Sequence, residues 1–218
     1  MIKITKERSD KVYGLWSRVY DLSHHLQTLW TDTKYRKAVI KYTNLKKDDN
    51  VLDVGAGTGL TSIEAHKIHP SCKITGLDLS GKMIEKAKSK YGLEKDICFI
   101  VGNMENLKLE DNTFDVILSC YGLGGVYNIK RAFEEMVRVA KPNARFVCVE
   151  MSEPPKEDKF KWWVHKHFVG PYIKCLWNFR DLNLHPLFKN YGIEIKEQKY
   201  FNDRIFGSTT LVSGILRK

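Results

Sequence analysis

Short apolar runs alternate with segments of helical periodicity through the middle of the chain. Glycine, proline, aspartate and asparagine bound the apolar runs, and these residues favour turns. We expect five strands, at residues 51–54, 73–77, 97–101, 114–119 and 145–150. Helices are expected among them, at residues 61–68, 80–91 and 129–140. Strands that alternate with helices in this way predict βαβ units, and therefore an α/β fold with a parallel, doubly wound sheet.

The two ends of the chain differ from this middle part. Residues 7–45 carry apolar side chains at helical spacing, which predicts N-terminal helices. After the break at Pro154-Pro155, aromatic and basic residues crowd the chain as far as residue 181. A short helix and a hairpin-like pair of strands are expected next, at residues 182–190, 193–200 and 209–216. The complete prediction is a mostly parallel seven-stranded sheet with helices on both faces, N-terminal helices and an aromatic-rich insertion after the fifth strand.

Composition narrows the class of protein. A chain of 218 residues, 43% of them hydrophobic, can build one complete core and little more. No apolar run approaches the roughly 18 residues of a membrane span, and the charged N-terminus lacks the apolar stretch of a signal peptide. Five scattered cysteines without a C-x-x-C pair indicate neither a disulfide framework nor a zinc site, so no metal is expected. These features favour a reduced, cytoplasmic location.

The net charge of the chain is +10. Such a balance favours anionic partners, which include nucleic acid, acidic lipid surfaces and acidic substrates. Charge alone is weak evidence, because many lysine-rich proteins bind none of these. No segment looks like an appended RNA-binding domain, so nucleic acid is not the expected partner.

The loop after the first expected strand is the most informative segment of the chain. Residues 51–59 read V-L-D-V-G-A-G-T-G, so that Asp53 is followed by glycines at 55, 57 and 59. Glycine tolerates positive φ and has no Cβ, which lets a ligand approach bare backbone at the start of a helix. The pattern is D-x-G-x-G-x-G and differs from G-x-G-x-x-G, the signature of dinucleotide-binding loops. A more compact cofactor is therefore favoured.

Polar residues follow the other expected strands at the same edge. Asp78 ends the second strand, Asn103 follows the third, and Cys120-Tyr121 follow the fourth. Ligands of doubly wound sheets bind outside the carboxyl ends of the strands, so these residues are expected to converge on one crevice with the glycines. A carboxylate at the position of Asp78 can accept hydrogen bonds from both hydroxyls of a ribose.

Residues 50–154 resemble the class I S-adenosylmethionine-dependent methyltransferases, and most of all the ubiquinone/menaquinone C-methyltransferase group. The similarity rests on segments at residues 51–59, 76–80, 102–105, 111–115, 121–123 and 133–142. The resemblance implies a Rossmann-like methyltransferase fold, S-adenosylmethionine as cofactor and S-adenosylhomocysteine as product. It also implies one domain over residues 1–218, made of an N-terminal helical cap, a cofactor-binding core, a substrate-facing insertion and the last two strands, at 1–45, 46–151, 152–190 and 191–218.

The resemblance and the strand ends together give a set of cofactor-binding residues. The loop backbone would face the methionine end, Asp78 the ribose, and Asn103 with Met104 the adenine ring. An ordinary turn is the alternative for Asn103. Cys120 matches a cofactor-contacting position rather than a nucleophile, because Ser119 replaces the proline that precedes the reactive cysteine of some RNA methyltransferases. The expected set is Asp53, Gly55, Ala56, Gly57, Thr58, Gly59, Asp78, Leu79, Asn103, Met104 and Cys120.

Two tyrosines are the candidate catalytic residues. The pair Tyr20-Asp21 resembles a pair ahead of the glycine-rich motif whose tyrosine reaches the active site of the family, and Tyr121 follows the fourth strand. For both tyrosines the alternative is half-buried packing with a hydrated hydroxyl group. His24 and His25 are weaker candidates for a base, and we expect them to be surface or hydrogen-bonded histidines.

The methyl acceptor is the least determined part. Quinone enzymes of the family typically follow Phe-Gly-Leu with Arg-Asn, whereas this chain follows Tyr121-Gly-Leu123 with Gly124-Gly125. We expect methyl transfer by in-line displacement to a small, lipophilic acceptor that is quinone-like or lipid-like. The alternatives are N- or O-methylation of a soluble small metabolite or of a phospholipid amine headgroup, with RNA less favoured.

The aromatic and basic residues of 156–180 are the expected substrate-facing element. They would form a lid over an apolar substrate, or a patch that contacts anionic lipid headgroups at the periphery of a membrane. The alternative is a helix that covers the core, with Trp162 and Trp177 packed inward and the lysines in water. The sequence leaves the oligomeric state open.

Overall fold

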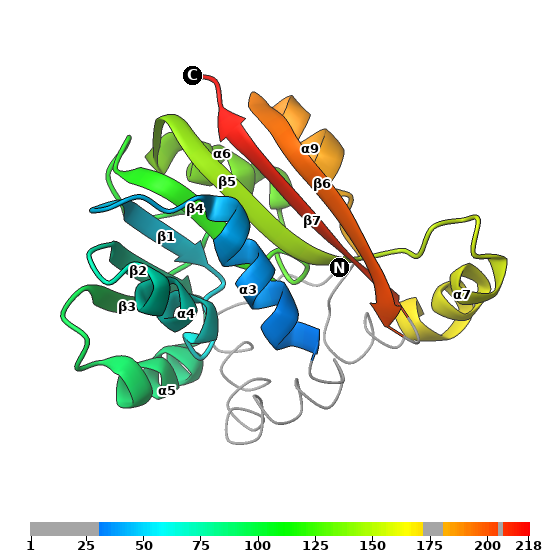
Figure 1. The fold of residues 1–218 in the computed structure, drawn as a ribbon, viewed down its shortest axis with the longest axis horizontal. Coiled ribbons are helices and arrows are strands. Elements are labelled where there is room, and N and C mark those ends of the chain that lie inside the picture. The colour runs from blue at the N-terminus through cyan, green and yellow to red at the C-terminus, as the bar shows by residue number, and fades with distance from the viewer. Residues whose placement is uncertain (1–30, 172–180, 205–206) are drawn as a thin grey trace.

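A computed structural model describes residues 31–171, 181–204 and 207–218 of the chain (Figure 1). The expectations for Tyr20, His24, His25 and Trp177 lie outside these residues, as does most of the predicted N-terminal helical cap. The described part of that cap is the helix α3 (Thr31–Thr43), which lies across one face of the sheet and contacts β4 and β5.

Seven strands form one sheet in the order β3-β2-β1-β4-β5-β7-β6. Neighbouring strands from β3 to β5 pair in parallel, whereas β7 runs antiparallel between β5 and β6. The predicted doubly wound, mostly parallel sheet is confirmed. The strands are β1 (Asn50–Val54), β2 (Lys73–Asp78), β3 (Ile97–Val101), β4 (Phe114–Cys120), β5 (Ala140–Ser152), β6 (Ile193–Arg204) and β7 (Gly207–Leu216).

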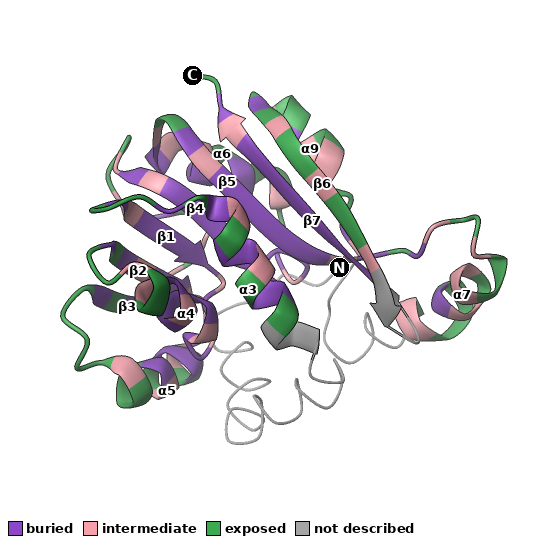
Figure 2. Cartoon of the chain, in the orientation of Figure 1, coloured by how far each residue is buried: buried purple, intermediate pink, exposed green. Residues whose placement is uncertain are grey.

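Helices cover both faces of this sheet. α3, α4 and α5 share one core cluster, to which they contribute Tyr35, Ile63 and Ile84, and α6 and α9 share the other through Phe133 and Phe188. Figure 2 shows that the central strands are buried along their length, as expected for parallel strands covered on both sides. Besides α3, the helices of these two layers are α4 (Leu60–Ile68), α5 (Gly81–Tyr91), α6 (Ile129–Val139) and α9 (Leu184–Asn190).

Local signals in the sequence set where two of these helices begin. The Ser80 hydroxyl accepts a hydrogen bond from the backbone N of Met83 at 3.4 Å, at the start of α5. The side chain of Asn128 accepts one from the backbone N of Arg131 at 3.1 Å, at the start of α6. Such caps satisfy N–H groups that the first turn of a helix leaves without partners. Both helices therefore start beside the carboxyl-terminal edge of the sheet.

Strand β5 is longer than the sequence predicted, because it begins at Ala140. The sequence placed the start of this strand at residue 145, and within the preceding residues Asn143 has a positive φ of 61°, which is typical of a turn. Ala140 nevertheless pairs with Phe114 on β4, and the register shifts before Val116. The turn residues are therefore taken up inside an irregular start of the strand.

The chain that follows β5 projects away from the sheet (Figure 1). It contains α7 (Lys159–Val164) and the π-helix η1 (His165–Val169), which continue into one another. No residue of α7 is buried, and Trp162 is half-buried rather than packed into the core. This segment is the described part of the predicted aromatic-rich insertion.

Candidate functional site

The glycine loop, residues 55–59, connects β1 to α4 in a sharp turn. Its glycines have φ of 76°, 55° and 83° at positions 55, 57 and 59. The backbone N–H groups of Gly55 and Ala56 both donate to the carbonyl oxygen of Leu77 on β2, at 2.8 and 2.9 Å. A Cβ on Gly55 would lie 2.5 Å from the Cα of Gly122, whereas a Cβ on Gly57 would meet no atom of the described residues within 4 Å. The loop is therefore packed tightly against the β4 end and open at Gly57.

The carboxylate of Asp78 joins three segments at the end of β2. Its Oδ2 accepts a hydrogen bond from the backbone N of Gly57, and its Oδ1 accepts one from the backbone N of Ser80, both at 2.9 Å. A carboxylate has about four lone-pair sites, which is more than these two bonds occupy. Asp78 is half-buried, and Leu79 beside it is half-buried as well. This side chain therefore fixes the loop while presenting acceptor oxygens at the edge of the sheet.

Asp53 supports the glycine loop from below. It is fully buried, and its Oδ2 accepts a hydrogen bond of 2.7 Å from the Ser62 hydroxyl on α4. On the same side, the Arg36 guanidinium of α3 donates to the Thr61 hydroxyl at 2.8 Å. Burial raises the pKa of Asp53 to about 6, against the opposing effects of the Ser62 hydrogen bond and the Arg36 charge. Asp53 therefore supports the loop from its buried side, on which Ala56, Thr58 and Gly59 are buried as well.

Asn103 and Met104 lie next to Asp78, because the backbone N of Gly102 donates to the carbonyl oxygen of Asp78 at 2.9 Å. The Asn103 side-chain oxygen accepts a hydrogen bond of 2.9 Å from the backbone N of Glu105. This is the turn that the sequence left as an alternative. Met104 is half-buried and packs against the core cluster of α6. The structure thus brings both residues to the edge, with the Asn103 oxygen already engaged in the turn.

Cys120 ends β4 in a buried position. Burial raises the pKa of its thiol to about 12, although the Arg36 charge and the Thr61 hydroxyl oppose the shift. The thiol is therefore protonated at neutral pH, and a protonated thiol is a poor nucleophile. The raised pKa therefore disfavours a covalent role for Cys120, and its contact with the cofactor stays a prediction.

Tyr121 turns the chain at the end of β4, with a positive φ of 61°. Its backbone N donates to the carbonyl oxygen of Val149 at 2.8 Å, and its hydroxyl lies 3.1 Å from the Thr209 hydroxyl on β7. The Tyr121 and Tyr35 rings are in a T-shaped contact, with 6.4 Å between their centroids. The centroids of the Tyr35 and Phe201 rings are 5.0 Å apart. These three rings form an aromatic cluster contributed by α3, β6 and the end of β4.

Glu150 is a buried carboxyl at the same edge that the sequence did not single out. Its Oε1 accepts a hydrogen bond of 2.7 Å from the backbone N of Leu123, in the loop that leaves β4. Burial raises the pKa of Glu150 to about 8, although the backbone N–H groups of residues 122–124 favour the charged form. An acidic residue at the end of an apolar strand is the same signal that identified Asp78, and it could have found Glu150.

The comparisons with known proteins agree on the class of this site. The sequence profile of the ubiE/COQ5 methyltransferase family matches residues 1–173. The chain belongs to this family. Its members use S-adenosylmethionine as cofactor.

One curated relative and two solved structures illustrate what the chain is similar to. A demethylmenaquinone methyltransferase of Staphylococcus aureus (strain JH9) is 33% identical over 153 residues, which are 70% of this chain and 64% of that relative. This chain therefore matches less than two thirds of the length of that curated relative. The crystal structure of the [4+2]-cyclase SpnF matches with a TM-score of 0.79 at 15% identity, over 100% of this chain and 98% of that one. A geranyl diphosphate methyltransferase in complex with S-adenosylmethionine matches with a TM-score of 0.69 at 13% identity, over 84% of each.

These structural similarities establish the fold alone. The cyclase name shows that this fold also occurs in a protein named for another chemistry, so function has to be argued from the site. The residues at this edge fit the family cofactor, since no atom of the described residues lies within 4 Å of a Cβ placed on Gly57, and Asp78 has two carboxylate oxygens there. The residues that hold this edge together and that sequence reasoning missed are Arg36, Glu150 and Thr209.

Every helix in the described residues is too short or too polar to span a lipid bilayer. The same part of the chain contains no group of three or more histidine, cysteine, aspartate or glutamate side chains arranged to hold a metal ion.

Proposed function

We propose that this chain transfers the methyl group of S-adenosylmethionine to a small lipophilic acceptor, of the quinone-like class, by in-line displacement. One observation carries the proposal: the end of β4 joins the glycine loop on one side to the aromatic cluster on the other. Gly122 contacts Gly55 of the loop, and the preceding Tyr121 belongs to the cluster. A donor on the loop and a flat apolar acceptor on the cluster would thus lie on either side of one turn.

On the donor side, this chain supplies binding and orientation. The cofactor provides a methyl group that is already activated by a positively charged sulfur. Asp78 would accept hydrogen bonds from the ribose hydroxyls, and the loop backbone at Gly57 would approach the methionine end. Asn103 would offer its amide N–H groups to the adenine edge, because its oxygen is engaged with Glu105. Leu79, Met104 and Cys120 would provide apolar contact beside them.

On the acceptor side, this chain supplies an apolar wall and one polar contact. Tyr121 and Phe201, the half-buried rings of the cluster, would pack against a flat ring and exclude water, with the fully buried Tyr35 behind them. This favours a close approach of the two reacting carbons. The Tyr121 hydroxyl, held by Thr209 at 3.1 Å, is placed to hydrogen-bond an oxygen of the acceptor. Protonated Glu150 would hold the loop between the two sides in place rather than act as a base.

The loop after Tyr121 favours a second candidate as well. It continues with Gly124-Gly125, which bring no charged or amide side chain toward the acceptor. An acceptor that needs little activation, such as the amine of a small metabolite or of a phospholipid headgroup, would suit this loop. Residues 152–190 would contact the acceptor in either case, as an insertion within a single domain over residues 1–218.

The test is an assay with radiolabelled S-adenosylmethionine and the purified chain. The acceptors offered are a short-chain demethylated naphthoquinol, a quinol with its ring position already methylated, phosphatidylethanolamine in detergent and a set of free amines. We expect label in the organic extract with the demethylated naphthoquinol and none with the blocked one. Label in the phospholipid or the amine samples alone would replace the proposal by the second candidate.

A further inference from the structure

The helical stretch of α7 and η1 exposes an unusual share of the large apolar side chains. Eight such side chains are exposed in the described part of the protein, and three of them lie within nine residues here. Phe160, Trp163 and Phe168 are 72%, 50% and 60% exposed. Scattered single apolar residues are normal on a protein surface, whereas a group of aromatic residues indicates an interaction surface.

The helical geometry gathers these residues on one side. Phe160 and Trp163 are three residues apart, which places them on the same face of α7. In an α-helix Phe168 would be out of line with Trp163 at a spacing of five, but the wider turn of the π-helix brings them together. The Trp163 and Phe168 rings contact at 5.6 Å between centroids, and Trp163 also contacts His167 at 5.4 Å. We call Phe160, Trp163 and Phe168 the aromatic stripe.

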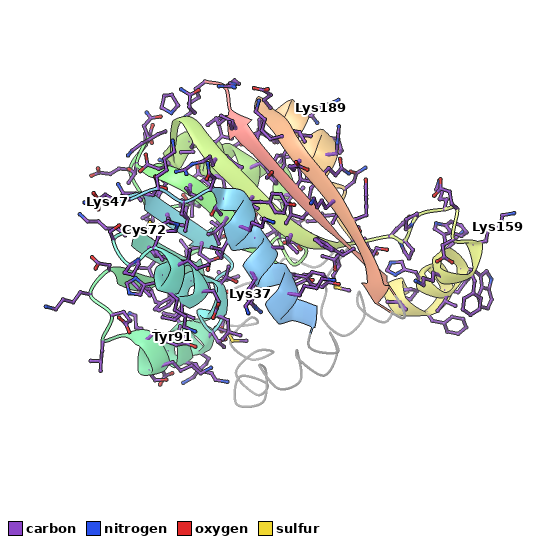
Figure 3. All side chains as sticks on the ribbon, viewed as in Figure 1. Lys37, Lys47, Cys72, Tyr91, Lys159 and Lys189 are labelled. Carbon is purple, nitrogen blue, oxygen red and sulfur yellow. The ribbon has the colours of Figure 1, made fainter. Side chains whose placement is uncertain are left out.

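The opposite side of the same stretch is anchored to the protein. His165 is buried, and its Nε2 lies 2.8 Å from the Asp181 carboxylate. Leu182, the next residue, donates its backbone N–H to the carbonyl oxygen of Met151 in β5, at 3.1 Å. The stretch therefore has a fixed inner side and an outer side that carries the stripe. Figures 1 and 3 show it projecting from the sheet, with Lys159 at its outer end.

Basic residues accompany the stripe. Lys159 and Lys166 are exposed, and the Lys166 ammonium lies 4.8 Å from the ring centroid of Trp162. Asp158 is engaged within the helix, since its carboxylate accepts the backbone N of Lys161 at 3.1 Å and pairs with the Lys161 ammonium at 3.7 Å. Aromatic rings beside lysines suit the headgroup level of a bilayer, where rings enter the boundary and ammonium groups meet anionic phosphates.

We infer that the aromatic stripe, with Lys159 and Lys166, is a docking surface for an anionic lipid bilayer. The inference rests on the proposed function, because a lipophilic acceptor would be dissolved in such a bilayer. In the chain the stripe comes after β5, which ends at the edge of the sheet that carries the glycine loop. Docking of the stripe would therefore bring the candidate site close to lipid. A second copy of the chain or a protein partner on the same surface would be a different occupant, and the test separates them.

The test measures binding of the purified full chain to vesicles, which requires no methyl transfer. Vesicles of phosphatidylcholine alone are compared with vesicles that also contain about a third phosphatidylglycerol, by co-sedimentation. We expect the anionic vesicles to bind the chain at least about tenfold more strongly, and salt to weaken this binding. Replacing the stripe by serine (F160S/W163S/F168S) is expected to lower the partition coefficient about tenfold or more.

Matched controls exist elsewhere on the surface. Leu93→Ser removes a fully exposed leucine after α5, and it is expected to leave vesicle binding unchanged. The pair Lys159→Glu and Lys166→Glu is compared with Lys47→Glu and Lys189→Glu, which lie on other parts of the protein (Figure 3). Calorimetry with S-adenosylhomocysteine checks that each variant retains a folded cofactor site.

The outcomes are distinct. The inference is overturned if the wild-type chain does not bind anionic vesicles, or if the stripe variant and the Leu93 variant bind equally well. It is also overturned if the wild-type chain sediments as a dimer without lipid and the stripe substitutions produce monomers. Vesicle binding without methyl transfer to any quinol would refute the proposed acceptor and leave the docking surface standing.

Discussion

The buried carboxyl of Glu150 accepts a hydrogen bond of 2.7 Å from the backbone N of Leu123, so the end of β5 holds the loop that leaves β4. That loop contains Gly122, whose Cα lies close to the glycine loop, and it follows Tyr121 of the aromatic cluster. Glu150 therefore connects the donor and acceptor sides of the candidate site without contacting either.

Stability should depend on pH through Glu150. Its pKa is raised from 4.5 to about 8, so between these values the folded protein holds a proton that the unfolded chain has lost. Its contribution is fully present below pH 4.5 and is lost as the pH rises towards 8. We expect urea unfolding to show that Glu150→Gln, which keeps an acceptor for Leu123, loses less stability than wild type between pH 5 and pH 8. The difference can reach about 1.4 kcal/mol per pH unit.

Glu134→Gln is the control for this experiment, because Glu134 is an exposed residue of α6 that pairs with Arg131. It should leave the pH dependence of the unfolding free energy as in wild type. An equal loss of stability in wild type and Glu150→Gln would show that Glu150 does not hold a proton in the folded state.

Cofactor affinity should depend on Asp78. Replacing Asp78 by alanine removes the acceptor for the backbone N of Gly57 and of Ser80, and with it the proposed contacts to the ribose. Hydrogen bonds to a charged group contribute about 1.5–3 kcal/mol each, so the affinity for S-adenosylhomocysteine should fall at least about tenfold in calorimetry. Glu85→Gln, at an exposed carboxylate of α5, should have no effect. Unchanged affinity in Asp78→Ala would remove this residue from the site.

Alanine substitutions at two glycines of the loop should have different effects, one on folding stability and the other on ligand affinity. Gly55→Ala places a Cβ 2.5 Å from the Cα of Gly122, so we expect a loss of folding stability, visible as a lower melting temperature. The Cβ of Gly57→Ala would meet no atom of the described residues within 4 Å, so the substitution adds only the strain of a left-handed backbone, roughly 1–2 kcal/mol. It should remain folded while binding S-adenosylhomocysteine more weakly. Normal binding by folded Gly57→Ala would mean that the ligand does not approach this backbone.

The Tyr121 hydroxyl should act together with Thr209. We expect Tyr121→Phe to lower kcat/KM for the acceptor about tenfold while leaving the affinity for S-adenosylhomocysteine unchanged. Thr209→Val keeps the shape of the threonine and removes its hydroxyl, so its effect should be smaller. A double-mutant cycle should give a coupling of about 0.5–1.5 kcal/mol, the worth of one hydrogen bond. Additive effects on kcat/KM would show that the two hydroxyl groups act independently.

The sequence predicted the arrangement of Asp78 and the glycine loop far better than that of Tyr121 and Thr209. Asp78 and the glycine loop are close in the chain and lie at the ends of adjacent strands, so the βαβ pattern places them together. Thr209 reaches Tyr121 only because β7 inserts between β5 and β6. A pairing over 88 residues leaves no local signal in the sequence, and nothing in the spacing of the last strands shows which one pairs with β5.

The polar residues beneath the site were missed for a second reason. Arg36 lies on a helix whose apolar spacing gives no sign of a buried cation, whereas Glu150 ends the expected fifth strand, so its position can be read from the sequence but its burial cannot. Their importance depends on burial, which raises the pKa of Glu150 and leaves Arg36 facing Thr61. Burial of a particular polar side chain follows from tertiary packing and cannot be read from residue type alone.

The interior position of β7 also has a consequence during synthesis on the ribosome. β5 leaves the ribosome well before β7, with which it pairs from Arg145–Ile215 to Ser152–Ser208. A nascent chain can thus form the glycine loop while the edge of β5 still lacks its neighbour. An unpaired strand edge is prone to wrong pairing, so this intermediate is where chaperones would be needed most. Translation therefore completes the glycine loop before Thr209, whose hydroxyl contacts Tyr121 of the aromatic cluster.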